Sequence, residues 1–269
     1  MSAIDNLFDS LRKNGRKALM PFVAAGDPDL DFTASLLETM VENGAALCEL
    51  GIPYSDPIAD GPVIQSSYTR ALENRVRLDD IFDMLRPLAP RLSAPVVTMA
   101  SSSIVYRRGP ARYVADAKTA GAAGTIVPDL PHEEAAELAA ICRESNFSLI
   151  QLVTPNTPRD RAVEIARSTS GFIYYVSVAG VTGGRREISP AIVENLRWLR
   201  GQTDLPICVG FGISTPDQAR LLAPSADGLI VGSAIVRRAS ESLVKGRKTA
   251  LDDGGRYVGG LAAALSEPV

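Results

Sequence analysis

Residues 206–236 read PICVGFGISTPDQARLLAPSADGLIVGSAIV, and this stretch contains the unit on which the fold depends. Two short apolar runs, PICVGFG (206–212) and GLIVGSAIV (228–236), predict strands. Between them lies STPDQARLLA, where Thr215 offers a capping hydroxyl just ahead of Pro216 at a helix start. Because neither run alternates with polar residues, we expect both strands to be buried on both faces and to pair in parallel across the helix.

Six further apolar runs repeat this unit along the chain: ALMPFVAAG (18–26), ALCELG (46–51), PVVTMA (95–100), GTIVPD (124–129), SLIQLV (148–153) and FIYYVSV (172–178). Segments with helical spacing lie between the later runs, at 131–145, 157–169 and 189–202. Eight such strands predict one domain over residues 1–269, an α/β fold of the (β/α)₈ TIM barrel type with an additional N-terminal helix. An open doubly wound sheet is the alternative, although its usual GxGxxG turn after the first strand is absent.

The composition is that of a soluble globular protein. Hydrophobic residues make up 46% of the chain, charged residues 22%, and the net charge of −3 is not that of a nucleic-acid-binding protein. No run approaches the roughly 18 apolar residues of a membrane span, and the first residues lack the pattern of a signal peptide. Cys48, Cys142 and Cys208 show no CxxC spacing, so we expect reduced, buried thiols in a cytoplasmic protein.

Glu49 is an acidic residue inside a strand-like apolar run. Alternation along a strand places it on the same face as Leu47 and Gly51, and we expect open space beside the glycine and a carboxylate directed into the mouth of the barrel. Apolar surroundings should raise the pKa of this carboxyl group toward the range useful for acid and base catalysis. The alternative is a glutamate held by a lysine or arginine, but no cation flanks it in sequence.

The loop after this strand, PYSDPIADGP (53–62), contains two more carboxylates. Asp56 precedes a proline and Asp60 precedes a glycine, and both pairs are common in turns for purely structural reasons. Three prolines nevertheless reduce the freedom of the loop. In a barrel the chemistry lies on the loops after the strands, so one of these carboxylates could face Glu49 across the mouth.

Glycine-rich turns follow the last three predicted strands, as GVTGG (180–184), VGFG (209–212) and VGS (231–233). Barrels often bind phosphate with the loops after strands seven and eight, where glycine allows backbone N–H groups to approach an anion. Any one of these turns could be an ordinary tight turn. Their coincidence with the strand order predicts a small phosphorylated substrate, bound by Gly212, Gly232 and Ser233.

Some classes of reaction can be excluded by residues that the chain lacks. None of the five lysines lies at the carboxyl end of a predicted strand, which argues against a Schiff-base aldolase. The single histidine, His132, stands at a helix start, and the cysteines are scattered, so no zinc site is expected. The reaction type that remains is proton transfer between carboxylates and a substrate that supplies its own electron sink.

The motifs PFVAAGDPD, ELGIPYSDPIADGPVIQ, PDLPHEE, GVTGGR, GFGIST and GSAIV occur in this order, and together they resemble the tryptophan synthase α-subunit family from about Ile4 to Leu265. The resemblance implies a (β/α)₈ barrel that cleaves indole-3-glycerol phosphate to indole and glyceraldehyde 3-phosphate. It implies no cofactor on this chain. A β subunit that carries pyridoxal phosphate is the implied partner, in an α₂β₂ complex that receives the indole through a tunnel.

The same resemblance assigns roles to individual residues. It makes Glu49 the general acid that protonates indole C3 and Asp60 the group that hydrogen-bonds the indole N1–H, and it leaves Asp56 to organise the loop. It makes Thr182 a loop residue that meets Asp60 when the loop closes. The phosphate donors would be Gly183, Gly212, Gly232 and Ser233, the indole pocket would be walled by Phe22, Ile64, Tyr174 and Phe211, and Asp129 would lie near that pocket.

One departure from the family pattern keeps two other functions open. Many members have a tyrosine and an asparagine after the third strand, where this chain has Ser101 and Ser103. Smaller side chains there would loosen the substrate pocket or the contact with the β subunit. The alternatives are a regulatory subunit with weak catalysis and a stand-alone lyase that releases free indole. The polar sequence RREIS after GVTGG also predicts a mobile lid over 180–190.

Overall fold

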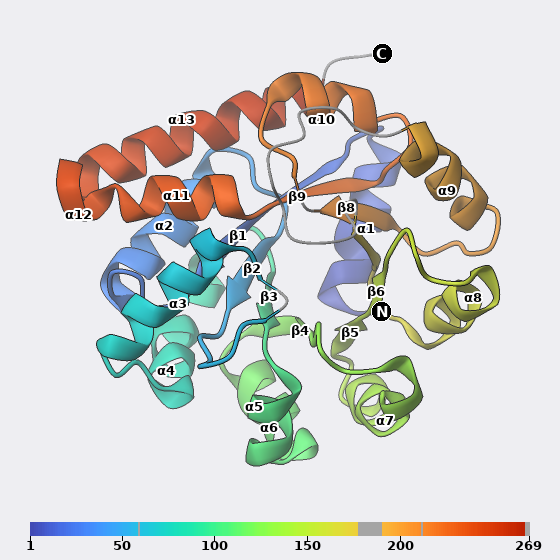
Figure 1. The fold of residues 1–269 in the computed structure, drawn as a ribbon, viewed down its shortest axis with the longest axis horizontal. Helices are drawn as coiled ribbons and strands as arrows, with labels where there is room; N and C mark the ends of the chain where they lie inside the picture. The colour runs from blue at the N-terminus through green and yellow to red at the C-terminus, as the bar shows by residue number, and fades with distance from the viewer. Residues whose placement is uncertain (59, 177–189, 211, 267–269) are drawn as a thin grey trace.

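The computed structural model describes residues 1–58, 60–176, 190–210 and 212–266 (Figure 1). Its strands are parallel and lie in the order β5-β4-β3-β2-β1-β9-β8-β7-β6. Their bounds are β1 (Ala18–Ala24), β2 (Cys48–Gly51), β3 (Val96–Met99), β4 (Ala122–Ile126), β5 (Ser148–Ile150), β6 (Leu152–Val153), β7 (Ile173–Val176), β8 (Ile207–Gly210) and β9 (Gly228–Val231). The predicted barrel is confirmed.

The closure of the barrel differs in one detail from the prediction. SLIQLV forms two short strands rather than one, because β5 pairs with β4 and β6 pairs with β7 on either side of Gln151. The two ends of the strand order are therefore one residue apart in the chain. The eight predicted runs thus become nine strands in the described part of the chain, and these form a nearly closed barrel.

The helices surround the sheet, as Figure 1 shows. Their bounds are α1 (Ala3–Lys13), α2 (Leu30–Glu42), α3 (Pro62–Glu73), α4 (Leu78–Leu88), η1 (Ala89–Arg91), α5 (Ser102–Arg108), α6 (Pro110–Thr119), η2 (His132–Glu134), α7 (Ala136–Glu144), α8 (Arg159–Ser168), α9 (Pro190–Arg200), α10 (Pro216–Leu222), α11 (Ser233–Ser240), α12 (Ser242–Lys245) and α13 (Arg247–Ser266). Among the described residues, no helix combines the length and the apolar character that a membrane span requires.

The starts of α10 and α11 can be compared with the elements predicted for residues 206–236. Thr215 caps α10 as predicted, and its side chain accepts a hydrogen bond from the backbone N–H of Gln218. The prediction of one strand over 228–236 was wrong at its end, because β9 stops at Val231 and α11 begins at Ser233. Ala234, Ile235 and Val236 are the buried face of that helix, and a short apolar run does not distinguish a strand from a buried helical turn.

Helix α1 closes one end of the barrel. Ile4, Phe8 and Leu11 on α1 pack with the apolar residues of the barrel interior, such as Met20. The hydroxyl of Ser148, the first residue of β5, donates a hydrogen bond to Ser2, which caps α1. This contact places α1 where the strands begin, so the opposite end, where the strands finish, is the one left for a site.

The three cysteines are free and buried, as the sequence predicted. Cys48 lies in β2, Cys208 in β8 and Cys142 in α7. Burial raises the pKa of the Cys48 thiol and of the Cys142 thiol to about 12. Because the thiolate is the reactive form, these side chains are apolar core residues rather than nucleophiles.

Candidate active site

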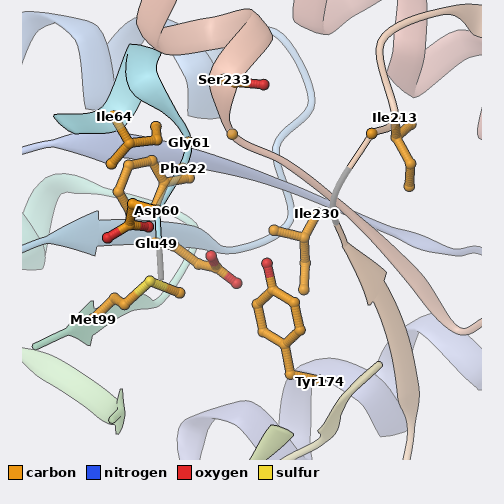
Figure 2. Close-up of a pocket in the computed structure, with 12 residues that line it drawn as sticks. Phe22, Glu49, Asp60, Gly61, Ile64, Met99, Tyr174, Ile213, Ile230 and Ser233 are labelled. Atoms are coloured by element: carbon orange, nitrogen blue, oxygen red, sulfur yellow. The ribbon is translucent and has the colours of Figure 1, made fainter. Parts of the chain in front are cut away.

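A cavity lies toward the carboxyl ends of the strands (Figure 2). Its lining consists of Phe22, Glu49, Asp60, Gly61, Ile64, Met99, Tyr174, Gly212, Ile213, Ile230, Gly232 and Ser233. The structure therefore brings together both predicted catalytic carboxylates, three predicted wall residues and the three residues predicted to bind phosphate from the turns after the last two strands. These residues come from five strands, β1, β2, β3, β7 and β9, and from the three segments that follow β2, β8 and β9, so no short stretch of chain contains the cavity.

Glu49 lies in β2, in register with Phe22 of β1 and Val97 of β3. Glu49 is fully buried, with an exposed fraction of 0%. Its carboxylate nevertheless borders the cavity and points toward it in Figure 2. Neither carboxylate oxygen has a hydrogen-bond partner among the described residues, which argues against the alternative of a glutamate held by a cation. Burial raises the pKa of Glu49 well above its usual range, so the side chain holds a proton available for donation.

The expectation of open space beside Gly51 was wrong. The ring of Phe22 and the hydroxyl of Tyr68 occupy that space, and a Cβ at Gly51 would lie 2.5 Å from the Tyr68 oxygen. No side chain larger than hydrogen leaves room for both groups. The glycine therefore allows two aromatic side chains to approach the strand that carries Glu49.

Asp60 lies in the loop between β2 and α3, at the edge of the same cavity. Its Oδ2 is 3.4 Å from the hydroxyl oxygen of Tyr54, which donates to it. Burial raises the pKa of Asp60 to about 6; the Tyr54 hydrogen bond opposes this shift, and the charge of Asp129 adds to it. The site therefore combines a carboxyl group on Glu49 that burial strongly favours in its protonated form with one on Asp60 whose pKa is about 6.

Hydrogen bonds within the loop hold Asp60 in place. Its backbone N–H donates to the Pro57 carbonyl at 3.1 Å, and the side-chain amide of Gln65 on α3 donates to the Asp60 carbonyl at 2.9 Å. Asp56 is exposed, and its carboxylate accepts a hydrogen bond from the neighbouring Ser55 hydroxyl. Asp56 thus belongs to the loop and not to the cavity lining.

The other side of the cavity is formed by the turns after β8 and β9. Gly212 has a φ of +80°, a conformation that glycine adopts without strain. Gly232 stands at the N-terminal end of α11, and Ser233 is the first residue of that helix. The unpaired N–H groups of a first helical turn attract an anion. These turns can hold a phosphate group on the same cavity that the two carboxylates border.

A model of the tryptophan synthase alpha chain family matches residues 8–265. The chain is 52% identical to the tryptophan synthase alpha chain of Rhodopirellula baltica, over 98% of this chain and 99% of that relative. It is 47% identical to the alpha chain of Trichormus variabilis, over 88% and 90% of the two chains. Among solved structures, tryptophan synthase subunit alpha from Legionella pneumophila superposes with a TM-score of 0.90 at 35% identity, over 98% of each chain.

The chain belongs to the tryptophan synthase alpha chain family. It is therefore a carbon–carbon lyase of tryptophan biosynthesis. The alpha reaction of this family cleaves indole-3-glycerol phosphate to indole and glyceraldehyde 3-phosphate. A cavity lined by acidic and aromatic residues together with glycine-rich turns suits a substrate with an indole ring and a phosphate group.

Several residues that the family resemblance singled out do not line the cavity. Asp129 lies outside the lining, where its carboxylate accepts hydrogen bonds from the Ser101 hydroxyl at 2.8 Å and from the Ser102 backbone N–H at 2.7 Å. It thereby accepts the first backbone N–H of α5, whose N-cap residue is Ser101, and its charge helps to raise the pKa of Asp60. Ser101 and Ser103 hydrogen-bond to each other at 2.9 Å, also outside the lining. Thr182, Gly183, Phe211 and most of the predicted lid lie outside the described residues.

Four residues of the lining were missed by sequence reasoning, namely Gly61, Met99, Ile213 and Ile230. Met99 and Ile230 lie in predicted strands, but which face of a strand meets the cavity depends on register. His132 contacts Gln151 and Ser168 rather than the cavity. In the part of the chain that the structure describes, no three acidic, histidine or cysteine side chains gather in a way that could hold a metal ion.

Proposed function

We propose that the chain carries out the alpha reaction by proton transfer from Glu49, with Asp60 stabilising the positively charged ring. The observation that carries this proposal is the position of the two carboxylates on one cavity, where burial raises the pKa of Glu49 well above its usual range and the pKa of Asp60 to about 6. Two titratable groups whose surroundings separate their pKa values are suited to act as an acid and as an anion in the same reaction.

In the first step the Glu49 carboxyl group gives its proton to C3 of the indole ring. This proton makes the ring an indolenine cation, and the C3–C3′ bond then breaks with its electron pair returning to the ring. The substrate hydroxyl at C3′ loses its proton to the Glu49 carboxylate as the aldehyde forms. Glu49 is thus restored, and protons and electrons balance.

Asp60 would accept a hydrogen bond from the indole N1–H, and its negative charge would oppose the positive charge of the ring. Such a charge is most effective when it is fixed before the reaction begins. The hydrogen bonds that hold the Asp60 backbone to Pro57 and Gln65 provide this preorganisation. Phe22, Ile64 and Tyr174 would form the wall of the indole pocket, and their place on the cavity supports this role.

The phosphate group would bind at Gly212, Gly232 and Ser233, together with Gly183 from the turn after β7. The N-terminal end of α11 supports the site by its positive partial charge. Thr182 would contact Asp60 when its loop closes over the substrate, and Phe211 would complete the indole pocket. Asp129 would act from the edge of the site through its charge.

The proposal includes a partner. We expect a tryptophan synthase β subunit to bind this chain in an α₂β₂ complex and to carry the pyridoxal phosphate, so that the α chain needs no cofactor of its own. Family membership supports this expectation. A solved structure titled Mycobacterium tuberculosis tryptophan synthase contains a chain 33% identical to this one, with a TM-score of 0.90. As an enzyme of amino-acid biosynthesis, the protein would work in the cytoplasm.

The test is an assay of indole release from indole-3-glycerol phosphate, with and without the β subunit. We expect turnover by the chain alone, a higher rate with β, and loss of turnover in Glu49→Gln. Glu42→Gln, which alters an exposed glutamate at the end of α2, is the matched control and should keep the wild-type rate. Unaltered turnover in Glu49→Gln would contradict the proposed acid. No turnover by the wild type, with activation of β, would indicate a regulatory subunit.

A further inference from the structure

We propose that Tyr54 is a positioning residue for Asp60, and that its hydroxyl group holds the carboxylate in the orientation that meets the substrate. The inference rests on the proposed function, in which Asp60 acts as an anion beside the indole ring. Tyr54 itself does not line the cavity. It would therefore act through Asp60 and not by contact with the substrate.

The contact joins the hydroxyl oxygen of Tyr54 to Oδ2 of Asp60 at 3.4 Å. This distance is longer than the usual 2.5–3.0 Å of an O–H···O hydrogen bond. Catalytic hydrogen bonds are often long without a ligand and shorten when the substrate binds.

The ring of Tyr54 cannot turn away freely from this position. It packs against the ring of Tyr68 with centroids 5.7 Å apart and planes at 54°. Tyr68 lies on α3, and its exposed fraction is only 1%. Phe22 and Ile64, which line the cavity, belong to the same apolar cluster. A ring fixed by buried neighbours presents its hydroxyl at one place, so Asp60 meets a donor that is already oriented.

Several titratable groups face Asp60. Tyr54 comes from its own loop, Asp129 approaches from the β4 side, Tyr68 from α3 and Tyr174 from β7. Burial and the charge of Asp129 both disfavour the ionised form of Asp60, whereas the Tyr54 hydrogen bond favours it. Loss of the hydroxyl group would leave the two unfavourable influences unopposed. The pKa of Asp60, now about 6, would then rise.

The experiment is the pH dependence of kcat/KM for indole release by Tyr54→Phe and by the wild type. If ionised Asp60 is required, the wild-type activity falls on the acid side with a midpoint near the pKa of Asp60, about 6. In Tyr54→Phe we expect this midpoint to move to higher pH by roughly 0.5 to 1 unit, the size expected for one net hydrogen bond. The rate at pH 8 should change much less, because Asp60 is ionised there in both proteins.

Tyr106→Phe is the matched control. The Tyr106 hydroxyl also makes a 3.4 Å hydrogen bond, to the backbone carbonyl of Glu134, but its side chain is exposed on α5. This variant should keep the wild-type midpoint. Urea unfolding of both variants checks the fold, and phenylalanine at position 54 keeps the ring that packs on Tyr68.

Two outcomes separate this inference from the proposed function. If Tyr54→Phe folds and its acid midpoint coincides with that of the wild type, Tyr54 does not position Asp60 and the inference is wrong. If Asp60→Asn retains both full activity and the acid midpoint, the role of Asp60 is wrong, and the proposed function fails first. A higher acid midpoint in Tyr54→Phe, together with loss of activity in Asp60→Asn, supports both the inference and the proposed function.

Discussion

The substitution Glu49→Gln should make the folded protein more stable at neutral and alkaline pH while it removes catalysis. Glu49 is fully buried, and neither carboxylate oxygen has a hydrogen-bond partner among the described residues. An ionised carboxylate in such a place is unfavourable, so the folded protein retains the proton that the unfolded chain releases. Glutamine has nearly the same shape and does not ionise.

The sign of the pH dependence follows from the raised pKa of Glu49. Its contribution to stability is fully present below the unfolded-state pKa of about 4.3 and is lost as pH rises to the folded-state pKa. Within that window each pH unit costs the wild type about 1.4 kcal/mol of unfolding free energy relative to Glu49→Gln. Asp60 has a raised pKa too, but it is present in both proteins and cancels in the difference.

The assay is urea unfolding of the wild type, Glu49→Gln and the control Glu42→Gln at half-unit steps from pH 5 to pH 8.5. The difference between the wild type and Glu49→Gln should grow with pH and then level off, and Glu42→Gln should follow the wild type throughout. Indole release by Glu49→Gln should fall by about 10² to 10⁴-fold, the usual contribution of a general acid. A difference that stays constant with pH would show that Glu49 titrates as an exposed carboxylate does, and the argument for a protonated acid would be refuted.

Three further substitutions test the surroundings of the site. Gly51→Ala should lose about 1–3 kcal/mol of unfolding free energy, because its Cβ would overlap the Phe22 ring; a variant as stable as the wild type would contradict this packing. Gly232→Ala should remain within about 0.5 kcal/mol of wild-type stability, since its Cβ would make an ordinary 3.6 Å contact with Phe22 Cβ. Its KM for the phosphate substrate should nevertheless rise, and an unchanged KM would argue against phosphate at this turn. Asp27→Asn should lose about 1–3 kcal/mol of unfolding free energy, measured by urea unfolding, because the buried Asp27 carboxylate accepts two hydrogen bonds from Arg70, at 2.8 and 2.6 Å. An unchanged free energy of unfolding would show that this pair does not stabilise the protein.

Local features of the chain were sufficient to predict the fold class, the positions of most strands and the start of α10. Apolar runs without polar alternation can only be buried strands or buried helical turns, and the helices between them require parallel pairing. The capping hydroxyl of Thr215 acts within four residues, so its role was readable directly. Where the local signal was ambiguous the prediction failed, as at β9, where the apolar pattern continues into α11.

The cavity was predictable in part, through the family motifs and the order of the glycine-rich turns. Glu49 stands out because an acidic residue is unusual in an apolar run, whereas only the family resemblance distinguished Asp60 from Asp56. The sequence did not show that Asp129 accepts hydrogen bonds from Ser101 and Ser102 at the start of α5, since these partners are 28 and 27 residues away in the chain. It also did not show that the space beside Gly51 is filled by two aromatic side chains.

The sequence by itself determined that this protein is a parallel barrel with an acidic residue in its second strand and glycine-rich turns after its last strands. Only the tertiary structure decided that Glu49 is buried with no hydrogen-bond partner among the described residues, that Tyr54 reaches Asp60, and which strand faces line the cavity. The physical reason is that periodicity and capping act over a few residues of one chain segment. Burial, charge and register at the site depend on side chains that strand pairing and helix packing bring together from β1, β2, α3 and β7.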